Sequence, residues 1–105
     1  MRSYLLVESR AEQESPDVPR FFELGTGLRR AGHPVTVFLI QNAVIGARAP
    51  AVTSLVDAGV EVWADESSVR TRGLLPEDYP EGVRLGGMPN LVSMLMAAGC
   101  VPVWH

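Results

Sequence analysis

Apolar and polar residues alternate along this chain in blocks that predict five short strands separated by helices. Strands are expected where compact runs rich in β-branched or aromatic residues occur, at 4–7, 34–40, 60–64, 83–85 and 100–105. Helices are expected where apolar residues recur at three- to four-residue spacing, at 15–31, 50–58, 65–72 and 91–98. The segment 43–47 is apolar without a clear period, so it predicts either a helical turn over the sheet edge or a contact surface.

An Ala-Gly pair ends three of the helical segments and precedes three of the strands. The pairs are Ala31-Gly32, Ala58-Gly59 and Ala98-Gly99, and glycine is the usual residue just beyond a helix C-terminus. Helix and strand therefore alternate, which favours an α/β fold with a mostly parallel sheet and helices on its faces. Pro102 cannot donate a ladder hydrogen bond, so the last strand is expected at an edge.

Composition restricts the classes of function. The 105 residues suffice for a single domain over 1–105, and 47% are hydrophobic, enough for a core. The net charge is −3 and the nine arginines are dispersed, which argues against nucleic acid as a partner. No apolar run is long enough to span a bilayer, and Glu8 comes too early for a signal peptide, so we expect a cytoplasmic protein.

The candidate functional site is the stretch 59–73, where a strand gives way to a helix. Asp65 follows the strand, and Ser67 and Ser68 fall in the first helical turn. Carboxyl ends of strands in open α/β sheets are common ligand sites, and Arg72 would suit an anion there. The alternative for Asp65 is a helix N-cap, with the serines completing that cap, and the alternative for Arg72 is a solvated surface charge.

Other polar residues are expected at the same edge of the sheet. Ser9 and Asn42 follow the first two strands, and His105 ends the last one. His33 falls at a helix-to-strand turn and belongs at the opposite edge, so no Ser-His-Asp triad can be assembled. The two histidines share no site, so we expect no metal, and no cofactor motif is present.

The ordered motifs resemble the DsrE/DsrF-like family of small sulfur-relay proteins over essentially the whole chain. The residues that carry the resemblance are Gly32-His33-Pro34-Val35-Thr36-Val37-Phe38, Asn42-Ala43-Val44, Gly59-Val60-Glu61-Val62, Ser67-Ser68, Arg72-Gly73-Leu74 and Gly82-Val83. The resemblance implies a three-layer α/β/α fold with about five strands. It also implies a trimeric or hexameric assembly, or a hetero-oligomer with related subunits, in a bacterial or archaeal cytoplasm.

The resemblance also implies a persulfide cysteine just after the third strand, and Asp65 stands at that position. An aspartate cannot hold a sulfane sulfur. The first hypothesis is therefore a non-carrying partner or scaffold subunit in sulfur transfer, with a sulfurtransferase as a possible partner. Cys100 is the single cysteine and could in principle carry sulfur. It is expected to begin the last strand, at the edge of the sheet opposite Asp65, and an inert buried thiol is the alternative.

The sequence leaves open whether the protein is an enzyme, with Asp65 the candidate catalytic residue. Apolar residues near the strand ends, Val44, Ile45 and Trp63, are candidates for an interface between subunits, and packing within one subunit is the alternative.

A second hypothesis is a small-molecule or anion-binding module. Its predicted ligand-binding residues are Ser9, Asn42, Asp65, Ser67, Ser68 and Arg72. We expect a ligand-induced rise in melting temperature that Asp65→Ala and Arg72→Ala abolish, because a ligand that binds only the folded state stabilises it. Full stabilisation in both variants, measured by thermal shift, would remove this site from consideration.

Overall fold

The computed structural model describes residues 2–105 and contains one sheet of five parallel strands. The strands are β1 (Ser3–Glu8), β2 (Val35–Leu39), β3 (Glu61–Asp65), β4 (Val83–Gly86) and β5 (Cys100–Trp104). Their order across the sheet is β4-β3-β2-β1-β5, and every neighbouring pair is parallel. The predicted five-stranded parallel sheet is confirmed, and β5 with Pro102 lies at an edge as expected.

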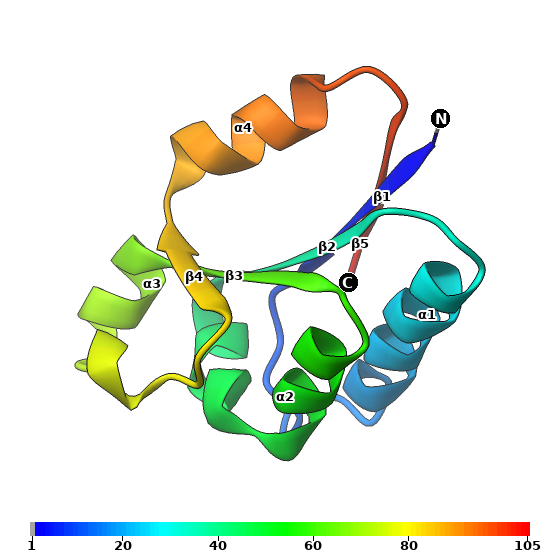
Figure 1. Cartoon of the computed structure of the whole chain (residues 1–105). Coiled ribbons are helices and arrows are strands. Elements are labelled where there is room, and N and C mark those ends of the chain that lie inside the picture. Colours follow the sequence, from blue (N-terminus) through cyan, green and yellow to red (C-terminus); the bar gives the residue numbers. More distant parts are fainter. Residues whose placement is uncertain (1) are drawn as a thin grey trace.

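Helices connect the strands and cover both faces of the sheet. The α-helices are α1 (Val18–Arg30), α2 (Pro50–Asp57), α3 (Glu66–Thr71) and α4 (Met88–Met96), and the 3-10 helices are η1 (Gln41–Arg48) and η2 (Pro76–Asp78). In Figure 1, α1 and α2 lie below the sheet, α3 lies at its left end beside β4, and α4 lies alone above it. The result is the expected three-layer α/β/α fold. None of the helices in residues 2–105 has the length and hydropathy needed to cross a membrane.

The larger core lies between the sheet and the helices α1 and α2. Alternation along the strands directs Leu6, Val37 and Val62 to this side, and all three are fully buried. Gly25 allows α1 to approach closely, because a side chain there would meet Leu6 at 3.3 Å. The segment 43–47 belongs to η1 and covers this core, so the helical-turn interpretation is the right one.

The opposite face is covered by α4 alone. Leu5, Val7 and Phe38 are buried there with Leu91 of α4. Trp63 stacks on Phe38, with 6.2 Å between ring centroids and an interplanar angle of 4°. One nine-residue helix cannot cover five strands, so apolar side chains on this face stay exposed.

One expectation about apolar residues was wrong. Val44 is fully buried in the larger core and is not a candidate for a subunit interface. Trp63 packs within the subunit, as the alternative had it, while Ile45 is exposed.

We predict that Gly86→Ala destabilises the fold by on the order of 1–3 kcal/mol, because of overpacking. A methyl group at Gly86 would lie 2.6 Å from two ring atoms of Trp63 and 2.8 Å from the side-chain oxygen of Asn90. The Trp63 ring is held by Phe38 and by a 2.8 Å hydrogen bond that its Nε1 donates to Glu61, so it cannot move aside freely.

The matched control is Gly27→Ala in α1, where an added methyl group meets nothing within 4 Å. This change should stabilise the protein by up to about 1 kcal/mol, since alanine favours a helix over glycine. Urea unfolding measures both variants, and equal stability of the two would contradict the packing at Gly86.

Candidate functional site

Polar residues gather where the strands end, because all five parallel strands end at one edge of the sheet. Asp65 is the last residue of β3 and the N-cap of α3. Its carboxylate accepts a 3.0 Å hydrogen bond from the backbone N–H of Ser68 and a 2.7 Å bond from the Ser68 hydroxyl. Asp65 is only 5% exposed. Its oxygens therefore serve mainly to begin the helix, as the N-cap alternative had it.

Ser68 links α3 to the segment that follows β2. Its Oγ accepts a 2.9 Å hydrogen bond from the backbone N–H of Gln41. Gln41 has a φ of 50°, and among residues 2–105 no other non-glycine residue has a positive φ. Non-glycine residues in this region are strained and often found at functional sites. The Ser68 hydroxyl helps to hold this conformation.

Arg72 joins the same two segments through its guanidinium group. Its Nε and Nη2 donate to the side-chain oxygen of Asn42 at 3.0 and 2.8 Å, and its Nη1 donates to the backbone oxygen of Ser68 at 3.2 Å. Asn42, Ser68 and Arg72, which the sequence predicted together, thus form one hydrogen-bonded group with Asp65. Most of the donors of Arg72 already have partners within this group.

The loop after β1 reaches this group through Glu14. Its side chain accepts a 3.0 Å hydrogen bond from the backbone N–H of Ala11. The hydrogen bond from Ala11 is the main cause that holds the pKa of Glu14 below its ordinary value. A hydrogen bond from the Asn42 side chain and the charges of Arg10 and Arg72 add to it, and desolvation opposes them. The exposed carboxylate of Glu14 thus approaches the group on the side of Asn42.

Two predicted ligand-binding residues lie outside this group. Ser67 is exposed, and its backbone oxygen accepts a 2.8 Å hydrogen bond from the Thr71 hydroxyl. Ser9 follows β1, and its hydroxyl donates to the backbone oxygen of His105 at 2.9 Å. Because β5 lies on the other side of β1 from β2, this bond turns Ser9 away from the group around Asp65.

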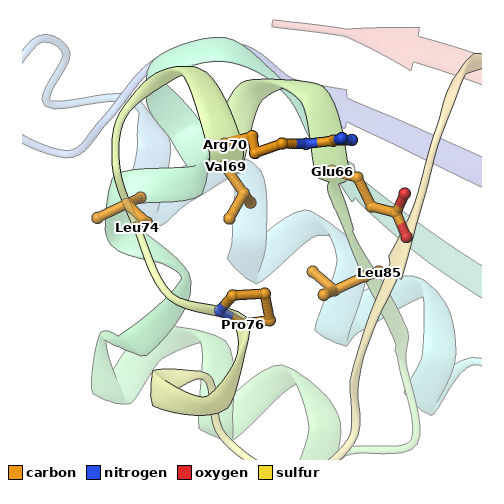
Figure 2. Close-up of a pocket in the computed structure, with 6 residues that line it drawn as sticks. All are labelled: Glu66, Val69, Arg70, Leu74, Pro76 and Leu85. Atoms are coloured by element: carbon orange, nitrogen blue, oxygen red, sulfur yellow. The ribbon is translucent and has the colours of Figure 1, made fainter.

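A cavity of about 300 Å³ lies on the other side of α3 (Figure 2). It is lined by Glu66, Val69, Arg70, Leu74, Pro76 and Leu85. Figure 2 shows Val69, Pro76 and Leu85 on its walls, with the charged ends of Glu66 and Arg70 near its rim. None of the predicted ligand-binding residues lines it, so the cavity and the hydrogen-bonded group are distinct features.

Sequence analysis missed the role of Glu8. This carboxylate is fully buried, and its Oε1 lies 2.7 Å from Nδ1 of His105. Strand alternation could have indicated its burial, because Glu8 faces the same side as Leu6. No local pattern could have indicated its partner, which is 97 residues away along the chain.

Cys100 and His33 lie at the opposite edge, as expected. Cys100 begins β5 in register with Ser3, and its half-buried side chain packs on the α4 side. His33 precedes β2 and packs edge-on against Tyr4, with 5.2 Å between ring centroids. Within residues 2–105, no three His, Cys, Asp or Glu side chains are grouped to hold a metal ion.

The fold matches that of solved structures. The ychN protein from E. coli has a TM-score of 0.82 and 20% identity, over 98% of this chain and 100% of that chain. MTH1491 from Methanobacterium thermoautotrophicum, a protein of unknown function, has a TM-score of 0.71 and 19% identity, over 99% and 98% of the two chains. No family model and no curated protein matches the chain in sequence. At this identity, the likeness establishes a shared fold.

We predict that Ser68→Ala destabilises the protein by about 1–3 kcal/mol, since it breaks two hydrogen bonds and leaves the N–H of Gln41 without its acceptor. The change removes the hydroxyl donor to Asp65, which keeps only the backbone N–H of residue 68. Ser67→Ala is the control and should change stability by about 0.5 kcal/mol or less, because that side chain is exposed. Chemical denaturation compares the two, and equal effects would contradict the importance of the Ser68 hydroxyl.

Proposed function

We propose that this protein is DsrE-like and acts as a non-carrying subunit, a partner or scaffold, in sulfur-transfer chemistry. The observation that carries the proposal is that Asp65, at the end of β3, is a buried carboxylate hydrogen-bonded to Ser68. In the family that the sequence resembles, this position holds the cysteine that carries the persulfide. Here it holds a carboxylate committed to Ser68 at 2.7 and 3.0 Å.

Sulfur carriage requires an accessible thiolate in an electropositive setting. Asp65 has no sulfur and is almost entirely buried. Cys100 begins β5, whereas Asp65 ends β3, so the only thiol of the chain lies at the opposite edge of the sheet from the polar group. Persulfide carriage by Cys100 therefore has the least support of the functions considered.

A partner surface is the second requirement of this role, and the α4 side of the sheet supports it. Exposed apolar side chains on this side are Met88, Val92 and Met96 of α4 and Trp104 of β5. Met96 is 81% exposed. Large apolar side chains left in solvent on one side of a molecule are candidates for a protein contact surface. We propose that it contacts identical or related subunits, in a trimer, a hexamer or a hetero-oligomer, in the cytoplasm.

The alternative, a small-molecule or anion-binding module at 65–72, has weaker support. Three donors of Arg72 are already occupied by Asn42 and Ser68. The cavity beside α3, lined mostly by apolar side chains, is the observation that favours a binding function, enzymatic or not.

The test of the proposal is native mass spectrometry after incubation with a cysteine desulfurase and cysteine. We expect the subunit mass to stay unchanged, because no thiol stands at the position of the carrier cysteine. We also expect an oligomeric mass. A sulfur adduct that is lost on reduction and absent in Cys100→Ser would overturn the non-carrying role.

A pair of surface variants tests the assembly. Met96→Glu should shift the protein toward the monomer, because a charge would be buried at the contact. Leu75→Glu replaces an exposed leucine outside α4 and β5 and should leave the assembly unchanged. Equal masses for both variants and the wild type would remove α4 as the contact surface.

A further inference from the structure

A fully buried carboxylate lies at the end of the β1 strand, apart from the group around Asp65. Glu8 is 0% exposed, and both of its oxygens have partners. Oε1 lies 2.7 Å from Nδ1 of His105, and Oε2 accepts a 3.0 Å hydrogen bond from the backbone N–H of Arg10. A buried carboxylate needs hydrogen-bond donors to offset its lost hydration, and Glu8 has one donor for each oxygen.

The imidazole of His105 is held on several sides. The backbone N–H of His105 donates to Val7 at 2.9 Å, and the backbone N–H and hydroxyl of Ser9 both donate to its backbone oxygen, at 3.1 and 2.9 Å. The ring packs on Phe21, with 5.3 Å between ring centroids. These contacts fix the position of the ring, and Glu8 fixes its orientation.

The second ring nitrogen of His105 is left available. Nε2 forms no hydrogen bond with any of residues 2–105. No buried side-chain nitrogen or oxygen in that part of the chain lacks a partner, so Nε2 must reach the surface. The side chain is 23% exposed, which agrees with this. A neutral imidazole that donates from Nδ1 to a carboxylate carries its lone pair on Nε2.

The topology of the sheet places this pair where ligands often bind. The strand order runs outward from β1 through β2, β3 and β4, and β5 then adds on the other side of β1. The chain reverses direction across the sheet at this point, with α1 on one face and α4 on the other (Figure 1). Crevices at the carboxyl ends of strands beside such a reversal are preferred ligand sites in open α/β sheets.

We infer that Glu8 and His105 form an acid–base site, in which Nε2 of His105 takes a proton from a bound substrate and Glu8 orients the ring. The substrate class is a small polar molecule with an acidic O–H, N–H or S–H group. As the proton moves to Nε2, the ring becomes an imidazolium that pairs with the buried carboxylate. As the X–H proton moves to Nε2, the heteroatom X bonds to an electrophilic carbon. The bond from that carbon to its leaving group then breaks, and the proton passes from Nε2 to the leaving group or to water, so no oxidant or reductant is needed.

This inference is independent of the proposed role in sulfur transfer, because it uses neither Asp65 nor Cys100. A protein without a persulfide can have this acid–base site, and a protein that takes part in sulfur transfer can lack it. His105 is the group expected to touch the substrate, and Glu8 acts through it as a positioning residue.

Two measurements on the intact protein test the site. A two-dimensional ¹H–¹⁵N spectrum of the histidine rings, recorded where they are neutral, should show His105 protonated at Nδ1 and bare at Nε2. Hydrolysis of p-nitrophenyl acetate, with water as the proton donor, should fall about tenfold or more in His105→Gln and in Glu8→Gln, since a positioned base contributes at least this much. His33→Gln is the matched control and should retain the wild-type rate.

Either of two results would overturn the inference. One is a His105 ring protonated at Nε2 in the wild-type protein, which leaves no lone pair to act as the base. The other is an equal hydrolysis rate in His33→Gln and His105→Gln. If Glu8→Gln fails to fold, which circular dichroism would reveal, the wild-type spectrum and the two histidine variants still decide the question.

Discussion

Parallel pairing of all five strands is the constraint on which the rest of this structure depends. Because neighbouring strands run in one direction, every strand ends at the same edge, and residues far apart in sequence meet there. The backbone ladder sets this arrangement, and the two cores on either side of the sheet hold it. Both polar groups of the protein, around Asp65 and around Glu8, follow from that single geometric fact.

The two polar groups solve the same physical problem in different ways. A carboxylate that is buried at the end of a strand needs hydrogen-bond donors. Asp65 accepts from the backbone N–H and the hydroxyl of Ser68, three residues later in the first turn of α3, and so acts as the N-cap of that helix. Glu8 accepts from the backbone N–H of Arg10, and its second partner is the imidazole of His105, which follows β5. Only the second arrangement leaves a ring nitrogen of a histidine at the surface.

The two faces of the sheet are covered unequally by helices. Helices α1 and α2 with η1 close one face and supply most of the buried apolar side chains. The other face has α4 alone, which buries Phe38 and Leu91 but leaves Met96 and Trp104 in solvent. A small domain gains stability from covering such a surface, so the uneven helix cover and the proposed assembly are two aspects of one packing problem.

The sequence by itself determined the elements, the parallel sheet and the edge position of β5, because periodicity, Ala-Gly helix ends and Pro102 are local signals. It also placed Asn42, Asp65, Ser68 and Arg72 at one edge. The tertiary structure alone decided which of these side chains bond to one another, and that Val44 is buried. It alone joined Glu8 to His105, because the strand order that makes β1 and β5 neighbours is set by long-range packing and has no local signature.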